Sequence, residues 1–400
     1  MKLWAGLLIT LTPYFLPLDL PWVLLLCWLG YFMVWSEGPI PQVRWALLFA
    51  LAVPLLRITT PPILADDYLR YLFDGALINQ GILPYGKFPV DFPALGGLDI
   101  PKPEIATIYP PLAEGLFALS AWLNPSIVSL RLVNFMGVLI FVALCPWAFP
   151  QGSGRVQLLV ATCPLVQQEL LHSAHIDAWL LPFLALWHGY AHRDRVGLAG
   201  AALIGAAMIK ITPFFLLLPW FWARPQHRKS IVLVGITGLL CFSPVIAELL
   251  PSLSVFYQAM DGFSPLYRVL RLWLPMDIAR MVLVSFGAVL LFFAPKTKLT
   301  LFQCLGLLGG LALFFPAGFP WYLTAALPWM VHQRKLWPLG FAGGLHLLYY
   351  LENLAPLFWA AVLLTLFFFL QGIYVIFTQP ANQLHQPHQP DVGKIPSGDR

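Results

Sequence analysis

The chain has 400 residues, of which 59% are hydrophobic and 10% are charged, and its formal net charge is +5 at pH 7. Soluble domains carry roughly 25% charged residues, so this composition excludes a protein whose surface is mostly exposed to water. Apolar runs of membrane-spanning length recur along the whole chain, which excludes a soluble domain with a single anchor. The sequence therefore predicts an all-α integral membrane protein that crosses the bilayer many times.

The predicted membrane helices follow the apolar runs in chain order. These run over approximately 3–18, 21–36, 43–58, 127–148, 156–171, 178–191, 196–222, 230–250, 281–295, 299–317, 320–331, 336–350 and 355–377. A span needs roughly 20 apolar residues and several runs are shorter, so we expect a polytopic bundle of about 11 to 14 helices. The first run resembles a signal peptide but lacks a small-residue cleavage site, so we expect it to be retained. The run 196–222 is interrupted between Lys210 and Pro213, which predicts a helix, a break and a short returning helix.

Basic clusters between the spans predict the orientation of the chain. They comprise Arg193/Arg195, Arg224/Arg228/Lys229, Lys296/Lys298 and Arg334/Lys335. The excess of Lys and Arg in cytoplasmic loops places these clusters inside, and it explains the positive charge without any nucleic-acid partner. The long polar loop 59–110 then lies outside the cytoplasm. Alternation of sides holds only if 111–123 does not span, so we interpret that run as non-spanning.

The domain organisation is simple. Residues 1–377 form one membrane domain, within which 59–110 is the large first extracytoplasmic loop, and 378–400 is a polar tail rich in Pro and Gln that we expect to be disordered and cytoplasmic. The five cysteines all lie in apolar runs and their number is odd, so the sequence favours neither disulfides nor a CxxC-type metal site.

Two adjacent carboxylates, Asp66 and Asp67, follow the third apolar run directly. The pattern predicts a helix from Asp67 to Gln80, on which Asp66, Arg70 and Asp74 share one face. A simpler interpretation makes Asp66 an N-cap and Arg70–Asp74 an ordinary surface pair. That interpretation explains one aspartate but not two beside a bilayer. A carboxylate placed on a hydroxyl group can act as a general base, so Asp66 and Asp67 are candidate catalytic residues.

Three further blocks carry polar groups at the ends of apolar runs. The first, 107–112, taken alone indicates a proline-initiated helix with an aromatic residue at the interface. In the second, His172 and His175 precede Asp177. These side chains could ligate a metal, but such groups more often bind one another or a substrate, and their cost in a membrane favours a role in a site.

The third block contains Lys210, the only charge between Val196 and Ala223. A lysine near a helix end can simply extend to the membrane surface, or it can hold a phosphate. Arg57, Tyr267, Arg268 and Arg271 are expected on the same side of the membrane and would add to a phosphate site.

Taken in order, five blocks resemble the GT-C superfamily of polytopic glycosyltransferases, and more closely its bacterial mannosyltransferases that use polyprenyl-phosphate sugars. The blocks are Asp66–Gly75 with Gly81–Tyr85, Thr107–Leu112, His175–Ala178, Ile209–Pro213 and Phe319–Leu323. Two positions depart from the family pattern. Tyr68 comes one place early, and Leu83 replaces the usual Asn.

The resemblance implies a GT-C-like bundle whose first external loop carries short helices and the catalytic residues. It implies an inverting transfer in which Asp66 or Asp67 is the base and Lys210, with arginines, steadies the leaving phosphate. The implied substrate-binding residues are Arg57, Arg70, Tyr71, Asp74, Tyr85, Tyr109, His172, His175, Asp177, Lys210, Tyr267, Arg268, Arg271, Trp321 and Tyr322. No cofactor is expected, and any dependence on a divalent metal is expected to be weak.

The implied partners are a polyprenyl-phosphate-linked sugar donor, a glycan or glycolipid acceptor and membrane lipid. The implied location is the inner (plasma) membrane, with the active site on the extracytoplasmic side. Two other classes remain open, a flippase or transporter of lipid-linked sugars and a polymerase or ligase that works on them. The glycosyltransferase interpretation requires Asp66/Asp67, His175 and Lys210 to converge on one outward-facing cavity.

Overall fold

The computed structural model describes residues 2–15, 21–36, 42–62, 65–93, 100–259, 265–293, 319–332 and 336–351, together with a few single positions between 359 and 371. All regular secondary structure in these residues is helical, as the composition predicts. The first half contains α1 (Lys2–Thr10), α2 (Pro21–Ser36), α3 (Val43–Ala52), α4 (Asp67–Asn79), α5 (Pro111–Leu123), α6 (Ile127–Ala148), α7 (Ser153–Thr162) and α8 (Leu180–His192). The second half contains α9 (Val196–Ala207), α10 (Leu217–Ala223), α11 (Arg228–Phe242), α12 (Ile246–Ala259), α13 (Pro265–Arg271), α14 (Met276–Phe293), α16 (Leu327–His332) and α17 (Leu336–Leu351).

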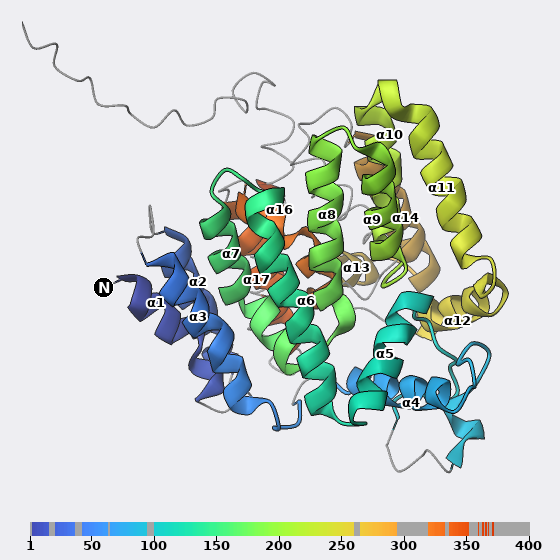
Figure 1. Ribbon diagram of the computed structural model, residues 1–400, viewed down its shortest axis with the longest axis horizontal. Coiled ribbons are helices and arrows are strands. Elements are labelled where there is room, and N and C mark those ends of the chain that lie inside the picture. The colour runs from blue at the N-terminus through green and yellow to red at the C-terminus, as the bar shows by residue number, and fades with distance from the viewer. Residues whose placement is uncertain are drawn as a thin grey trace, which may run out of the picture.

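The helices form one bundle around a central group, α6 to α9, with α1 to α3 on one flank and α11 on the other (Figure 1). The short helices α4 and α5 lie together at one end of this group, and the turn between α10 and α11 lies at the opposite end. Short 3₁₀ segments join several helices, including η2 (Val53–Arg57), η6 (Ile176–Trp179), η7 (Thr212–Leu216) and η10 (Pro320–Ala326). The two ends of the bundle therefore carry different loops. The described part of the polar loop 59–110, which we call the acidic loop, lies at the α4 end.

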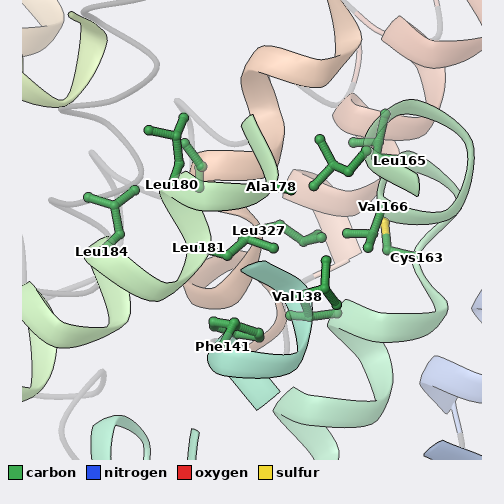
Figure 2. Close-up of a cluster of buried hydrophobic side chains, with 14 of the residues drawn as sticks. Val138, Phe141, Cys163, Leu165, Val166, Ala178, Leu180, Leu181, Leu184 and Leu327 are labelled. Carbon is green, nitrogen blue, oxygen red and sulfur yellow. The ribbon is translucent and has the colours of Figure 1, made fainter. Parts of the chain in front are cut away.

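The hydrophobic core holds the segment around residue 175 against the central helices. Figure 2 shows side chains from α6, α8, α16 and the segment after α7 gathered in one cluster. Its labelled members are Val138, Phe141, Cys163, Leu165, Val166, Ala178, Leu180, Leu181, Leu184 and Leu327, and all of them are buried. Interiors packed in this way are dense and resist local shifts, so this core fixes the backbone on either side of His175.

Two breaks in the apolar runs shape the bundle. The run 196–222 divides into α9, η7 and α10 with Lys210 between them, which confirms the predicted break. The run 156–171, expected as one helix, instead contains α7 and a π-helical segment, η5 (Leu165–His172), separated by Pro164. Proline cannot donate the backbone hydrogen bond that would continue a helix, so α7 ends before it. π-helical turns occur frequently at functional sites.

Only one described helix, α6, is long and apolar enough to cross a membrane by itself. A second span is obtained if residues 225–242 and 246–258, which are bent by 89°, are counted as one. Other apolar helices, including the 13-residue α5, are shorter because prolines and polar residues interrupt the runs. The runs 299–317 and most of 355–377 lie outside the described residues, so the number of spans stays a prediction. So does the disordered tail 378–400, which also lies outside them.

Candidate active site

The acidic loop contains α4, whose first residue is Asp67. Asp66 occupies the N-cap position, but its side chain makes no capping hydrogen bond and is exposed. The simple N-cap interpretation is therefore wrong for this side chain, and the Asp66 carboxylate is left facing solvent. Gly81 follows α4 with a φ of +77°, a conformation that favours glycine, and this explains why the helix ends within one residue of the predicted end.

Asp67 faces inward from the start of α4. One carboxylate oxygen, Oδ2, lies 3.6 Å from Nδ1 of His175, while 38% of the Asp67 side chain remains exposed. Partial burial raises the pKa of Asp67 above its usual range, and the charges of Asp66 and Asp177 raise it further, whereas His175 and Lys210 lower it. A carboxyl group with a raised pKa is a stronger base once ionised, which suits general base catalysis.

His175 is held rigidly behind Asp67. The π-helical segment η5 ends at His172, and Ala174 then adopts a φ of +63°, which is rare for a residue other than glycine. Asn134 in α6 secures this turn by donating to the carbonyl of His175 at 2.9 Å. The His175 ring is buried and stacks on Trp321 with 3.9 Å between ring centroids. Strained backbone of this kind persists where the surrounding structure enforces it, often at functional sites.

Lys210 lies in the break between α9 and η7 and reaches Asp177. Its ammonium donates to both carboxylate oxygens of Asp177, at 2.7 and 2.9 Å, and lies 3.8 Å from the ring centroid of Tyr322. A buried cation needs a compensating anion, and here the protein itself supplies one. An ammonium has three donors, and the two bonds to Asp177 leave one for a further anion. Lys210 is also close enough to Asp67 to affect its pKa.

Four aromatic residues line the same corner. The hydroxyl of Tyr109 donates to the hydroxyl of Tyr71 at 3.2 Å, and the Tyr71 hydroxyl lies 3.4 Å from Nδ1 of His175. Tyr71 also stacks on Phe117 in α5 with a centroid distance of 4.4 Å. Tyr85 donates to the carbonyl of Tyr109 at 3.1 Å, so the downstream Gly81–Tyr85 block contacts the 107–112 block. Pro110 and Pro111 begin α5, as predicted for a proline-initiated helix.

Arg70 and Asp74 lie beneath this corner and not on the protein surface. Nε of Arg70 donates to the Asp74 carboxylate at 2.9 Å, and the two side chains are 10% and 0% exposed. The surface-pair interpretation is therefore wrong. Nη1 of Arg70 donates to the carbonyl of Ile105, and Thr107 donates to Glu114 at 2.6 Å. This buried network ties the end of the acidic loop to α4 and α5.

Arg57 and His172 both contact Arg131, a buried cation that was not identified from the sequence. Arg131 in α6 is buried and donates to the carbonyls of His172, Arg57 and Ile58. Nη2 of Arg131 lies 3.4 Å from Nδ1 of His172, and Arg57 donates to the carbonyl of Pro13 at 2.8 Å. A guanidinium beside His172 repels a metal cation, which argues against a metal bound by His172 and His175 together. Among the described residues, no three His, Cys, Asp or Glu side chains form a group that could hold a metal ion.

The residues predicted around α13 lie against α14. Tyr267 packs with Ala279 and Leu283, and Nη1 of Arg271 donates to the carbonyl of Leu274 at 2.9 Å. Arg268 lies between them in the same short helix. The structure thus brings together Asp67, Tyr71, Tyr109, His175, Asp177, Lys210, Trp321 and Tyr322 from five segments, while α13 forms its own corner with α14.

Two buried residues, Glu169 beside His175 and His346 beside Glu169, were also not identified from the sequence. Glu169 lies in η5, and its carboxylate is 3.5 Å from Nε2 of His175 and 2.8 Å from Nε2 of His346 in α17. The signal was present, because an ionisable residue inside an apolar run is expensive and usually functional. Glu169 is the only acidic residue in the run 156–171, as Arg131 is the only charged residue in 127–148.

The described residues are all helical, and they bring carboxylates, a buried cation and aromatic rings together at one corner. The family described as alpha-(1->6)-mannopyranosyltransferase, N-terminal domain, matches residues 18–224. This match covers more than half of the chain and includes Asp67, His175 and Lys210, and the chain belongs to this family of mannosyltransferases. It thus confirms the resemblance to mannosyltransferases. Comparison with curated proteins and with solved structures found no match.

Proposed function

We propose that this mannosyltransferase transfers a hexose, mannose in the simplest case, from a polyprenyl-phosphate donor to a hydroxyl of a lipid- or glycan-linked acceptor. The observation that carries the proposal is the meeting of Asp67, His175 and the Lys210–Asp177 pair at one end of the bundle. This arrangement places a base of raised pKa close to a cation, which is the pair of groups that such a transfer needs.

The proposed reaction is a single displacement. The acceptor hydroxyl gives its proton to the Asp67 carboxylate while its oxygen attacks the anomeric carbon of the sugar. The bond between that carbon and the phosphate oxygen breaks, and the lipid phosphate leaves with the electron pair. One displacement inverts the anomeric centre. No step calls for a metal or another cofactor, because a phosphate already bound to a lipid is a competent leaving group next to a cation.

Lys210 is proposed to bind the phosphate oxygen as its negative charge grows. Only contacts that strengthen in the transition state lower the barrier, and a cation beside the leaving group is such a contact. Asp177 orients the ammonium, and Tyr322 covers it. Of the two aspartates, we assign the base to Asp67, because it faces His175 and Lys210 whereas Asp66 faces solvent.

The membrane setting supports a lipid-linked donor. Helix α6 is long and apolar enough to span a bilayer. The acidic loop at α4 and the basic residues between α10 and α11 lie at opposite ends of the helices, as expected for an external site and a cytoplasmic turn (Figure 1). We therefore propose a multi-pass protein of the plasma membrane with its active site on the extracytoplasmic side.

The test uses the purified full chain in lipid nanodiscs with labelled donors. We expect transfer from polyprenyl-phosphate mannose and none from a nucleotide-linked mannose. Lys210→Met should lose at least about 100-fold in kcat, equivalent to roughly 2.7 kcal/mol of transition-state stabilisation. Lys87→Met, which removes an exposed lysine from the polar loop 59–110, should retain the wild-type rate.

Three outcomes would overturn the proposal. Transfer from the nucleotide sugar alone would remove the lipid donor. Movement of lipid-linked sugar across liposomes without cleavage of the phosphate–sugar bond would identify a flippase. Transfer of an intact oligosaccharide in place of a single hexose would identify a polymerase or ligase.

A further inference from the structure

Behind Asp67, four buried side chains form a line that runs into the bundle. Asp67 is followed by His175, then Glu169, then His346, and finally Trp28 in α2. The side chains of His175, Glu169 and His346 are all 0% exposed. The proposed reaction uses only Asp67 at the exposed end, so the buried members of this line need a separate explanation.

The hydrogen bonds of His346 define its protonation state. The indole N–H of Trp28 donates to Nδ1 of His346 at 3.3 Å. An indole nitrogen can only donate, so Nδ1 of His346 must be unprotonated. Its proton is then on Nε2, which lies 2.8 Å from Oε1 of Glu169 and donates to it. His346 is therefore a neutral imidazole that orients Glu169 but does not neutralise it.

Glu169 is thus a buried carboxylate that still lacks a counter-charge. Its second oxygen, Oε2, makes no hydrogen bond within 3.5 Å and faces Nε2 of His175, which likewise has no closer partner. In the described part of the chain, the ion-pair partners of Glu169 are these two imidazoles. A buried charge is tolerated only when it is paired, and His346 is neutral, so the positive charge falls on His175.

We propose that Glu169 and His346 are positioning residues that keep His175 protonated, so that a buried imidazolium holds the base Asp67 ionised and correctly placed. With both ring nitrogens protonated, Nε2 of His175 points to Glu169, and Nδ1 faces both Asp67 and the Tyr71 hydroxyl. The distances of 3.5 and 3.6 Å are within ion-pair range, and catalytic contacts are often this long before substrate binds. The inference rests on the proposed function for its catalytic meaning, but the charge on His175 stands on the geometry alone.

The first test reads the charge directly and needs no activity. Nitrogen NMR of the full chain labelled with ¹⁵N-histidine in nanodiscs should show two protonated ring nitrogens for His175 at neutral pH. The signal is identified by its loss in His175→Gln. In Glu169→Gln, a near-isosteric change without the charge, His175 should become neutral. A neutral His175 in the unaltered protein would overturn the inference even if the protein is an active mannosyltransferase.

The second test follows the pH dependence of kcat/KM with the lipid-linked donor. Asp67 is faced by the charged groups His175, Asp66, Lys210 and Asp177 and by the hydroxyls of Tyr71, Tyr109 and Tyr322. Glu169→Gln removes the positive charge from His175. An opposite charge at this distance lowers a carboxyl pKa by about 1 to 3 units, so losing it raises the pKa of Asp67. The acid limb of the profile, where kcat/KM falls as the pH drops, should therefore move up by about one pH unit. At high pH the rate should recover.

The matched control is Glu248→Gln in α12, outside the line, which should leave the acid limb in place. If Glu169→Gln instead lowers kcat/KM equally at every pH and leaves the acid limb in place, Glu169 serves only in packing. That result would overturn the inference. An absence of transfer by the unaltered protein would overturn the proposed function instead, and the NMR result would still decide the charge on His175.

Discussion

Asp66 and Asp67 are neighbours in sequence, yet the structure gives them different surroundings. Asp66 is exposed and makes no capping bond, whereas Asp67 faces His175 and is raised in pKa by burial and by nearby negative charge. We expect Asp67→Asn to reduce kcat by at least about 100-fold with expression preserved, because the amide cannot accept the proton. The measurement is transfer from lipid-linked mannose by purified variants.

Asp66→Asn is the matched control and changes the pH profile in a defined direction. The base must be ionised, so the rate falls as the pH drops through the raised pKa of Asp67. Removing the Asp66 charge removes one cause of that rise, and the acid limb should move to lower pH while most of the rate at neutral pH is kept. Loss of activity in Asp66→Asn with normal turnover in Asp67→Asn would exchange the two roles.

At the scale of elements, the approach of α4 to α5 is set by one glycine. A Cβ at Gly75 would lie 2.3 Å from the carbonyl oxygen of Phe117, far inside contact distance, and backbone cannot move aside cheaply. Gly75→Ala should therefore separate the two helices and cost about 1 to 3 kcal/mol of stability. We expect a lower thermal midpoint in detergent and reduced transfer, because Tyr71 and Phe117 stack across this contact.

Gly115→Ala in α5 provides the comparison. A Cβ there meets nothing within 4 Å, and alanine is the better helix former, so the thermal midpoint should stay the same or rise. Equal destabilisation by both variants would show that the close approach of α4 and α5 does not decide the effect.

Elements whose boundaries depend on local chemistry were predicted well from sequence. The α4 helix ends at Asn79, one residue short of the prediction, because Gly81 takes a positive φ, and the break at Lys210 falls where Pro213 requires it. The π-helical segment η5 was not predicted, because its residues have the pattern of an ordinary apolar helix. Bonds from Asn134 and Arg131 to its last turns hold that geometry, and such contacts are not visible in sequence.

The site was predicted in the same uneven way. The motif blocks identified Asp67, His175 and Lys210, and the structure places them together. Partners that are brought to the site only by packing were not identified, among them Glu169, His346 and Arg131. The partner of Lys210, Asp177, was named as a site residue, but nothing in the residue pattern pairs the two side chains. Pairing across the bundle depends on how the helices pack, which residue patterns constrain only weakly.

At the scale of the whole molecule, the two ends of the bundle should lie on opposite sides of the membrane. In a cysteine-free background, a cysteine at exposed Gln80 should react with an impermeant thiol reagent in intact cells, and one at exposed Gln226 should not. A cysteine at Gly97, which lies outside the described residues, should behave like the one at Gln80. Reaction at Gln226 alone would place the site in the cytoplasm and favour a nucleotide-sugar donor.

The Lys210–Asp177 ion pair bears on how each round of transfer ends. If the spent lipid phosphate binds Lys210, then Asp177 competes with it for the same ammonium and helps to expel it. Asp177→Asn should weaken that competition, so free polyprenyl phosphate should inhibit about tenfold more strongly, a change of about 1.4 kcal/mol in its binding. Rapid-quench kinetics should then show one fast transfer per enzyme followed by slow turnover, whereas Asp177→Glu should turn over steadily. An internal anion of this kind would make the enzyme resistant to product inhibition by polyprenyl phosphate, even in a membrane where that lipid accumulates.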